Sequence, residues 1–386
     1  EHLPPRPATD ADVPDYRVYL ADRLVVVDHQ ARRTEVIALA AGGADAAASE
    51  RAARAAIATM TQVAAACRQD EATLPAAPPA GADDLHDQLD GATVDQDDAA
   101  FAATVAALQR HIVAGDVFQV VPSRTFSLPC RDALAAFARL RALDPSPYLF
   151  YASTGDFTLF GASPEAAVRA DGPARTVELA PIAGTRPRGR RADGALDPEL
   201  DARYEAELRL DPKECAEHLM LVDLARNDVA RVARPGTRHV SALLRVERYA
   251  RVMHLVSRVR GELDAGLDAL HAYQAAMNMG TLTGAPKLRA MQLLREREPG
   301  RRSMYGGAIG CLLGDGTLET GIVIRAALVR DGVAHVRAGA GVVHDSVPAR
   351  EAEETRRKAA AVLRAIAQAE VEGEAERATR EVAHVA

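Results

Sequence analysis

The sequence of 386 residues is long enough for two or three domains, or for one large mixed domain. Apolar residues make up 48% and the formal net charge is −7, which allows a packed core but argues against a nucleic-acid binder with a basic face. No apolar run approaches the roughly 18 residues of a spanning helix, so no membrane segment is expected.

The first predicted elements are a hairpin and a helix. Tyr19–Asp28 and Arg33–Ala38 are apolar runs joined by a short turn, and Ala46–Cys67 is an Ala/Arg-rich segment that favours a helix. We expect residues 1–70 to be the remnant of an N-terminal region. Residues 71–98 are acidic and rich in Pro and Gly, which predicts a surface linker.

A catalytic domain is predicted over residues 99–370, followed by a tail over 371–386. It begins with a helix at Ala99–Ala114, capped by Asp97 or Asp98 and ended by a glycine. Strands are predicted at Val117–Leu128, Phe157–Phe160, Arg175–Leu179, Ala308–Leu313, Thr320–Val329 and Ala334–Val343. Helices are predicted at Ala216–Val232, Ala269–Asn278, Pro286–Glu296 and Arg350–Ala369. Short turns join several strand pairs, which indicates largely antiparallel sheets and an α+β class.

The positions of the cysteines argue against some kinds of site, and the few lysines are candidate functional residues. The four cysteines are too far apart in sequence for a redox pair or a compact zinc site, so reduced thiols in the cytoplasm are the simplest interpretation. Only three of the 47 basic residues are lysines: Lys213, Lys287 and Lys358. A bias that replaces Lys by Arg should leave lysine at sites that need a compact ammonium group. Chance could also explain why three lysines remain.

Four glutamates form two pairs. Glu214 and Glu217 are three residues apart, as are Glu351 and Glu354, so each pair shares one helix face. Facing carboxylates suit a hard cation such as Mg²⁺. A local alternative is a helix cap for Glu214 and an ion pair with Lys358 for Glu354.

Other segments could bind an anion. YGGAIG at Tyr305–Gly310 and AGAGVV at Ala338–Val343 allow close backbone approach, although tight strand packing explains the glycines equally well. Thr185 in PIAGTRPRGRR could hold a carboxylate or lie in an exposed basic loop. His254 lies among apolar residues, where a core histidine is usual. Arg325 interrupts an apolar strand, and a buried Arg needs an anion.

Several motifs occur together and in one order. They are SPE, PIAGTRPRG, KECAEHLMLVDLARND, VMHLVS, GTLTGAPK, YGGAIG, IVIRAAL and AGAGVVHDSVP, followed by ExEET. This set resembles the chorismate-binding enzymes, over about residues 99–369, and most closely the large components of anthranilate synthase. The resemblance implies an α+β fold of two largely antiparallel sheets flanked by helices, with the active site between them.

The resemblance also implies a Mg²⁺ site and a substrate site. Glu217 and Glu354 would ligate Mg²⁺ directly, with Glu214 and Glu351 acting nearby or through water, and the metal would hold the ring carboxylate of chorismate. Tyr305 and Arg325 would hold the enolpyruvyl carboxylate. The residues implied around the ring and its carboxylate are Gly184, Thr185, Gly339, Ala340, Gly341 and Lys358.

Catalytic roles follow from the same resemblance. Glu165 would protonate the departing C4 hydroxyl. Gln119 stands where water-using members have a Lys base, and Ala183 stands where aminodeoxychorismate synthases have a nucleophilic Lys. Both differences favour attack by ammonia at C2, giving 2-amino-2-deoxyisochorismate. His254 and Thr281 would then serve pyruvate elimination, which gives anthranilate for tryptophan biosynthesis.

Partners and regulation are implied too. None of the cysteines has the setting of a glutaminase nucleophile, so a separate glutaminase subunit is expected to deliver ammonia in a hetero-oligomer. Pro147, Tyr148 and Leu149 resemble one wall of a feedback site for tryptophan, with Ile309 and Cys311 as weaker candidates. The LLES-like segment of the other wall is not found in this sequence, which puts feedback inhibition in doubt.

Two alternatives remain open at this level. One is an enzyme of the same class that stops at aminodeoxyisochorismate or makes aminodeoxychorismate; His254 argues against the first. The other is a non-catalytic binding or regulatory subunit of the same fold, against which the carboxylates, Tyr305 and Arg325 argue.

Overall fold

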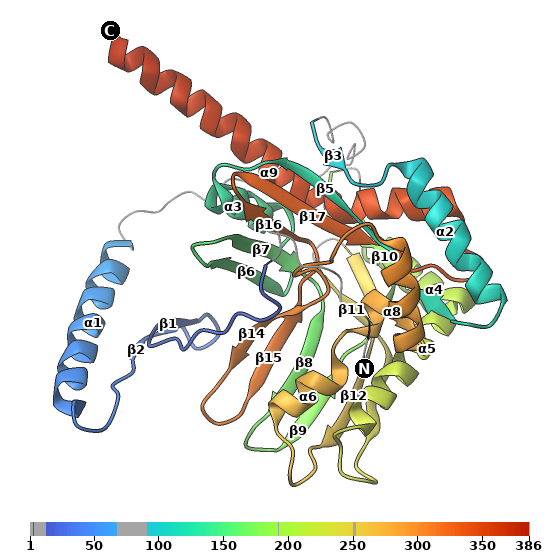
Figure 1. Cartoon of the computed structure of the whole chain (residues 1–386), viewed down its shortest axis with the longest axis horizontal. Coiled ribbons are helices and arrows are strands. Elements are labelled where there is room, and N and C mark those ends of the chain that lie inside the picture. Colours follow the sequence, from blue (N-terminus) through green and yellow to red (C-terminus); the bar gives the residue numbers. More distant parts are fainter. Residues whose placement is uncertain (1–2, 4–12, 68–90, 192, 250–251, 386) are drawn as a thin grey trace. The chain divides into compact units, whose positions relative to one another are not determined.

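The computed structural model describes residues 3, 13–67, 91–191, 193–249 and 252–385 (Figure 1). The chain divides into two compact units, Val13–Ala76 and the remainder. None of the helices in the described part of the chain is both long and apolar enough to cross a membrane.

The smaller unit contains a hairpin and a helix, as predicted. Strands β1 (Arg23–Asp28) and β2 (Arg33–Ala38) pair antiparallel, and helix α1 covers Ala46–Cys67. The Asp28 carboxylate accepts hydrogen bonds from two backbone amides of the turn, at 2.9 and 2.8 Å. The first strand is shorter than predicted, because it begins at Arg23 instead of Tyr19.

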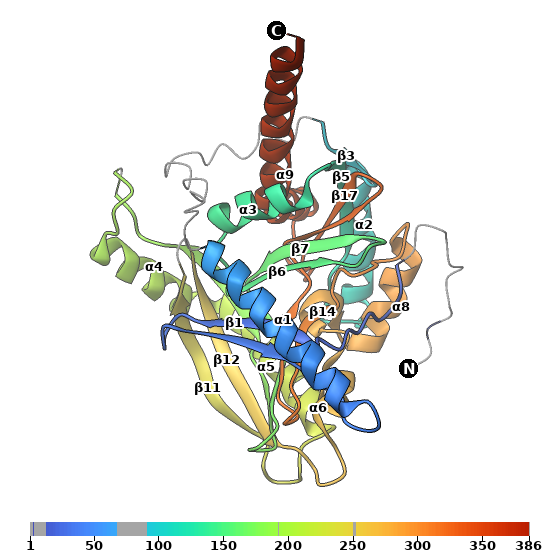
Figure 2. The same cartoon turned by 90° about the vertical axis from the view of Figure 1, so that its left-hand side faces the viewer.

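A seven-stranded antiparallel sheet forms one half of the larger unit (Figures 1 and 2). In spatial order its strands are β10 (Ile182–Pro187), β12 (Val252–Glu262), β9 (Thr176–Leu179), β8 (Ala166–Asp171), β15 (Leu318–Ile322) and β14 (Ala308–Leu312), with β11 (His239–Arg248) also paired to β12. Helices α5 (Pro212–Ala230) and α6 (Ala269–Ala276) pack on it through an apolar core that includes Val222, Val259 and Ala272.

A six-stranded antiparallel sheet forms the other half, and lies above the first in Figure 1. Its order is β3 (Thr93–Val94), β5 (Ser123–Pro129), β17 (Val333–Gly339), β16 (Ala326–Arg330), β7 (Thr158–Ser163) and β6 (Tyr148–Ser153). Helices α3 (Ala133–Leu143) and α9 (Pro348–Val385) cover one face, with Phe160, Leu140 and Leu363 in the core between them. The fold class predicted from the sequence is therefore confirmed.

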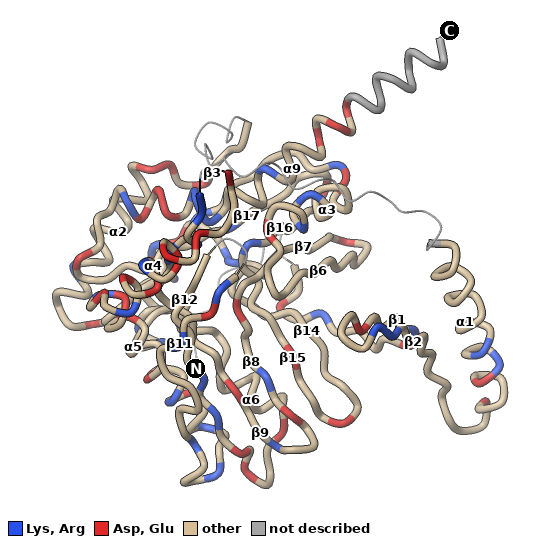
Figure 3. Tube along the Cα trace, turned by 180° about the vertical axis from the view of Figure 1, so that it is seen from behind, with Lys and Arg blue, Asp and Glu red and all other residues tan. Residues whose placement is uncertain are grey.

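The remaining elements surround these sheets. They are α2 (Asp98–Val113), α4 (Pro198–Leu210), α7 (Gly280–Thr283), α8 (Lys287–Arg297) and the short pair β4 (Gln119–Val120) and β13 (Gly284–Ala285). Figure 3 shows acidic and basic residues intermixed along α4 and α5. The last residues of the predicted linker form β3, which pairs with β5; residues 71–90 lie outside the described part.

Two predicted strands are each divided in the structure. Val117–Leu128 forms β4 and β5, interrupted at Pro122, which has no N–H to donate to a ladder. Thr320–Val329 forms β15 and β16, which belong to different sheets. Arg325 lies between them with a φ of +50°, so the chain turns there from one sheet into the other.

Other predictions differ in extent. The capped helix at Ala99–Ala114 is confirmed within one residue, with Asp97 as its N-cap. The final helix runs past Ala369 and through the predicted tail to Val385. Strands β6, β8, β10, β11 and β12 were not predicted, although β10 and β12 pair with each other and carry Thr185 and His254.

Candidate active site

The chain crosses between the two sheets twice, and the crossings lie side by side. Pro164 and Glu165 connect β7 to β8, and the segment ending at Arg325 connects β15 to β16. The backbone N–H of Ile322 donates to the Glu165 carbonyl, and that of Ala162 donates to the Arg325 carbonyl, each at 3.0 Å. The two crossings thus place Glu165, which is acidic, and Arg325, which is basic, where the two sheets meet.

Glu165 is a buried carboxyl with an unusual environment. Its Oε1 is buried without a hydrogen-bond partner, and so is Thr281 Oγ1. Burial raises the pKa of Glu165 to about 7, although the neighbouring Thr281 hydroxyl and the charge of Lys358 act to lower it. A large fraction of this carboxyl is therefore protonated at neutral pH and can donate a proton.

Arg325 is a partly buried cation at this junction. No hydrogen bond or ion pair of its guanidinium is found among the described residues, and burial lowers its pKa. The charges of Asp144, Tyr305 and Glu354 act in the opposite direction. An uncompensated buried guanidinium is costly, so the site favours an anionic group of a ligand.

Glycines at the end of β17 and in the following loop allow Tyr305, Pro122 and Lys358 to approach the backbone of this segment. A Cβ on Gly339 would lie 2.8 Å from the Tyr305 hydroxyl and 2.9 Å from the Pro122 carbonyl. The Lys358 ammonium donates to the Gly339 carbonyl at 3.0 Å. Ala340, next along the chain, is fully buried and donates its N–H to Pro122. The predicted glycine segment therefore brings Tyr305 and Lys358 together.

Gln119 is held against the first carboxylate pair. Its Nε2 donates to Glu217 Oε1 at 3.0 Å, whereas its Oε1 is buried and has no partner. A Cβ on Gly341 would approach Gln119 Nε2 to 2.8 Å, so only glycine leaves room for this amide. The site thus contains one vacant acceptor beside Glu217.

The four predicted carboxylates lie in the first two turns of α5 and α9, with Glu214 and Glu351 in the first turn and Glu217 and Glu354 in the second. The local alternatives are present: the Asp211 carboxylate caps α5 by accepting from the Glu214 N–H at 3.2 Å, and Lys358 pairs with Glu354 at 2.6 Å. Burial, followed by the charge of Glu214, raises the pKa of Glu217, with a smaller contribution from Glu354. These carboxylates are thus close enough to repel one another.

The oxygen atoms of these four carboxylates are ligands of the kind that a hard cation prefers. Burial also raises the pKa of Glu351, and the charge of Glu354 adds to this, so a divalent cation would relieve repulsion within the set. For Glu354 the charge and hydrogen bond of Lys358 outweigh burial, and its pKa is lowered. Within the described residues no three acidic, His or Cys side chains are gathered closely enough to hold a metal ion.

His254 and Thr185 face each other from adjacent strands. His254 Nδ1 lies 3.0 Å from Thr185 Oγ1 and 3.3 Å from the Gly184 carbonyl. A carbonyl can only accept, so Nδ1 carries the proton and Nε2 is left as an acceptor. Burial lowers the pKa of His254, which favours the neutral ring. Gly184 has a φ of +75° at a bulge, and a Cβ there would lie 3.2 Å from Glu214 Oε2.

The residues predicted for tryptophan lie elsewhere. Pro147 precedes β6, and Tyr148 and Leu149 begin it. The Tyr148 hydroxyl donates to Glu319 Oε1 and accepts from Arg169, both at 2.6 Å, which links the six-stranded sheet to the seven-stranded one. Ile309 and Cys311 are on β14.

Sequence reasoning missed His218. It is fully buried on α5, next to Glu217, with Nε2 2.7 Å from Ser257 Oγ on β12. Ser257 Oγ also accepts from the Leu244 N–H at 2.9 Å, so this hydroxyl joins α5 to β11 and β12. The signal was present, because a histidine stands where the apolar face of α5, with Leu221 and Val222, meets the sheet.

A second missed group surrounds Glu298, a buried carboxylate. It accepts from Ser123 N and Oγ at 2.9 and 2.8 Å and from Arg302 at 2.6 Å, and lies 3.1 Å from Arg337. Burial acts to raise the pKa of Glu298, but the charges of Arg302 and Arg337 lower it overall. In the sequence, this glutamate stands within REREPGRR, and such runs of alternating charge are usually solvated.

Comparison with known proteins identifies the class. The family described as chorismate binding enzyme matches residues 1–364, and the chain belongs to this family. The "Anthranilate synthase component 1, pyocyanine specific" of Pseudomonas aeruginosa is 56% identical over 382 residues, covering 95% of this chain and 67% of the relative. The "Anthranilate synthase component 1" of Escherichia coli is 53% identical over 366 residues, covering 95% and 68%.

Solved structures agree with the fold. That of anthranilate synthase component I from Streptococcus pneumoniae superposes with a TM-score of 0.72 at 34% identity, covering 89% of this chain and 72% of that one. The menaquinone-specific isochorismate synthase of Escherichia coli has a TM-score of 0.63 at 25% identity, covering 71% and 62%. The chain spans about two thirds of the length of the curated relatives it matches.

Proposed function

We propose that this chain converts chorismate and ammonia to anthranilate, pyruvate and water, as the large component of an anthranilate synthase. The carrying observation is the junction of the two sheets, where adjacent chain crossings hold a buried acid with a pKa of about 7 and a partly buried guanidinium for which the described residues supply no hydrogen bond or ion pair. This pair suits a substrate with a carboxylate to hold and a poor leaving group to protonate.

In the first step, the nitrogen of ammonia forms a bond to ring C2 and the bond from C4 to its hydroxyl breaks. Glu165 donates the proton with which that hydroxyl leaves as water. Arg325 and the Tyr305 hydroxyl hold the enolpyruvyl carboxylate. The vacant Gln119 Oε1 accepts a hydrogen bond from the incoming ammonia, which its amide group orients without removing a proton.

In the second step, the C2 proton of the ring is lost, the bond to the enolpyruvyl oxygen breaks, and the ring becomes aromatic. The neutral His254 ring, held through Nδ1, offers Nε2 as the proton acceptor. The Thr281 hydroxyl, which has no partner at rest, binds the substrate nearby.

We infer that Glu217 and Glu354 hold Mg²⁺, with Glu214 and Glu351 close to it. The mutual repulsion of these carboxylates supports this assignment. When bound, the ion supplies the positive charge that holds the ring carboxylate of chorismate. The backbone of Gly184, Thr185 and the glycine segment Gly339–Gly341 lines the ring.

A separate glutaminase subunit is proposed as the source of ammonia. Burial raises the pKa of the Cys130 thiol to about 12, which opposes thiolate formation at that position.

We also propose one wall of a tryptophan site. It consists of Tyr148, with its two hydrogen bonds, and its neighbours Pro147 and Leu149.

Product analysis distinguishes the candidates. Purified chain, chorismate, Mg²⁺ and ammonium are combined, and products are separated by mass. We expect equal amounts of anthranilate and pyruvate. Accumulation of aminodeoxyisochorismate or aminodeoxychorismate would support an enzyme that stops earlier, and unchanged chorismate with folded protein would support a non-catalytic subunit.

A further inference from the structure

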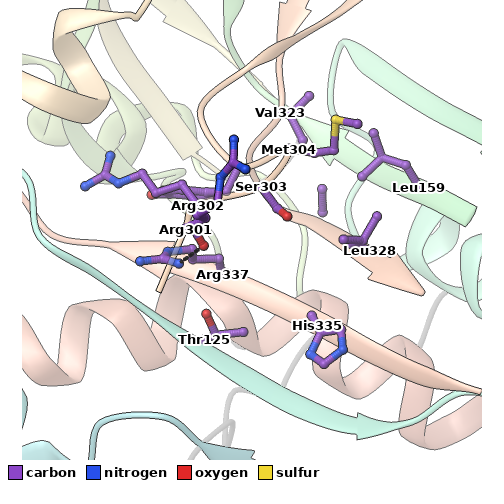
Figure 4. Close-up of a pocket in the computed structure, with 12 residues that line it drawn as sticks. Thr125, Leu159, Arg301, Arg302, Ser303, Met304, Val323, Leu328, His335 and Arg337 are labelled. Carbon is purple, nitrogen blue, oxygen red and sulfur yellow. Dashed lines mark hydrogen bonds between the residues drawn. The ribbon is translucent and has the colours of Figure 1, made fainter. Parts of the chain in front are cut away.

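Arg124 on β5 is the largest fully buried side chain among the described residues. Side chains alternate along a strand, so Thr125 points into a cavity on one face of the six-stranded sheet (Figure 4) and Arg124 points to the other face, where α9 packs. The guanidinium lies 5.0 Å from the centre of the Phe101 ring and 5.2 Å from that of Phe126. A cation in such surroundings is costly unless its N–H groups have acceptors.

All three nitrogen atoms of this guanidinium have acceptors. Nε donates to Thr355 Oγ1 at 2.8 Å, and Nη2 donates to the Ala352 carbonyl at 2.7 Å. Nη1 donates to the Gln96 carbonyl at 3.0 Å and lies 2.8 Å from Asp98 Oδ1. The Thr355 hydroxyl in turn donates to the Ala352 carbonyl at 2.7 Å. Arg124 is thus joined to α9 by two hydrogen bonds.

The two residues of α9 that Arg124 binds each follow a carboxylate of the proposed metal site. Ala352 comes directly after Glu351, and Thr355 directly after Glu354. Consecutive residues of a helix are separated by about 100° around its axis and about 1.5 Å along it. Hydrogen bonds to Ala352 and Thr355 therefore fix both the rotation and the axial position of the turns that carry the two carboxylates.

Helix α5 is anchored next to its own carboxylate. His218 directly follows Glu217, and its Nε2 lies 2.7 Å from Ser257 Oγ on β12. Helix α5 packs on the seven-stranded sheet, whereas α9 packs on the six-stranded one. The two carboxylate pairs thus come from helices that belong to different sheets, so the spacing between the pairs depends on how each helix is fixed.

We propose that Arg124 is a positioning residue for the Mg²⁺ site, which acts through α9 by holding Glu354 and Glu351 at the spacing from Glu217 that the ion requires. This inference rests on the proposed metal site. A lysine keeps the charge but replaces the planar guanidinium by a compact ammonium, which cannot reach the same set of acceptors. Arg124→Lys therefore removes the anchor without removing the cation.

The binding test is calorimetric titration of the metal-free chain with Mg²⁺, at a temperature below the Tm of every variant. We expect the Kd for Mg²⁺ to rise by about tenfold or more in Arg124→Lys. Thr355→Val removes the hydroxyl that accepts from Arg124 Nε and should also raise the Kd. Thr355→Ser retains this hydroxyl and should keep the wild-type Kd.

Leu363→Ala is the matched control for a general loss of stability. Leu363 is 2% exposed on the same helix, nine residues after Glu354. This variant should lower the Tm but keep the wild-type Kd for Mg²⁺. An unchanged Kd in folded Arg124→Lys and Thr355→Val, or an equal rise in Leu363→Ala, would show a purely structural role and overturn the inference.

Anthranilate formation separates this inference from the proposed reaction. If Mg²⁺ binds with the expected order of affinities but no variant and no wild type forms anthranilate, the proposed reaction fails and the positioning role stands. With an active wild type, the activity of Arg124→Lys should recover as the Mg²⁺ concentration is raised, because mass action offsets the weaker binding. No Mg²⁺ binding by the folded wild type would overturn the metal site and the positioning role together.

Discussion

At the scale of single residues, the Glu165 carboxyl makes activity depend on pH in a defined direction. The acid must be protonated to donate, and burial raises its pKa to about 7. We expect the Glu165 carboxyl to give a descending limb in which kcat/KM falls tenfold per pH unit well above 7. The measurement is a pH profile at a fixed concentration of free ammonia, so that ammonium ionisation does not contribute.

Glu165→Gln is the matched variant, and should lower kcat/KM by about 10²-fold or more and lose the descending limb of the pH profile.

The stability of the fold as a function of pH gives a second measure of the pKa of Glu165. The folded pKa is raised, so the wild type loses stability as pH rises from the unfolded value near 4.5 toward 7. The variant should therefore have a higher Tm at pH 8, with a smaller gap at pH 5. Equal Tm values at pH 8 would contradict the raised pKa.

Arg325 gives a prediction in which stability and activity change in opposite directions. Removing a partly buried cation that has no partner among the described residues should stabilise the fold modestly, so Arg325→Met should raise the free energy of unfolding by about 1–2 kcal/mol. The same change should raise KM for chorismate, because the carboxylate loses its guanidinium. Denaturant unfolding and steady-state kinetics measure the two effects.

Arg330→Met, at the end of β16, is the control. Among the described residues its guanidinium pairs with the exposed Asp331, at 3.6 Å, so its loss should change stability by less than about 1 kcal/mol. A less stable Arg325→Met would mean that Arg325 has a structural partner.

Lysine usage was informative at this scale. Lys287 is buried, and its ammonium donates to the Asp228 carboxylate at 2.9 and 3.0 Å and to the Ala276 carbonyl at 2.8 Å. Lys358 joins Glu354 to the Gly339 carbonyl. Both positions use a compact ammonium with several acceptors, which a planar guanidinium cannot replace.

At the scale of elements, the loop after β17 needs glycine at one position. Gly341→Ala would place a Cβ 2.8 Å from Gln119 Nε2, so the amide must move away from Glu217. We expect kcat/KM to fall at least tenfold and stability to fall by about 1–3 kcal/mol. Gly300→Ala is the control, because a Cβ there meets open space. Wild-type activity in Gly341→Ala would remove Gln119 from the mechanism.

The second turns of α5 and α9, which carry Glu217 and Glu354, give the metal prediction. Glu217→Gln and Glu354→Gln should each abolish activity, and should also remove the rise in Tm that Mg²⁺ gives the wild type. Glu353→Gln is the control, because it removes the same charge next to Glu354. This variant should keep both the activity and the rise in Tm with Mg²⁺. Full activity of the wild type in excess EDTA, or a Mg²⁺-dependent Tm in both variants, would contradict the assignment.

Six helices were predicted from local signals, whereas α3 and α4 were missed although Asp132 and Asp197 cap them. Asp97 caps α2, and apolar side chains recur along it at helical spacing. The division of Thr320–Val329 was not predictable, since the residues on both sides of Arg325 are apolar and β-forming. Which sheet a strand joins is decided by long-range pairing, such as that of Ala326 with Gly161.

At the scale of the whole molecule, the sequence motifs identified residues that the fold brings together at the sheet junction. Gln119 contacts Glu217, Gly339 approaches Tyr305, and Lys358 pairs with Glu354. The Glu298 group could not be predicted, because a run of alternating charges is usually solvated. Burial there depends on Ser123 and Arg337 from distant strands, a relation that spacing does not encode.

The most direct measurement of the central claim follows the nitrogen atom. The isolated chain is given chorismate, Mg²⁺, ¹⁵N-ammonium and unlabelled glutamine, and the products are analysed by mass spectrometry. The account predicts anthranilate that carries ¹⁵N, formed in equal amount with pyruvate, and no incorporation from glutamine. Unlabelled nitrogen in the product, or no conversion of chorismate by folded protein, would contradict it.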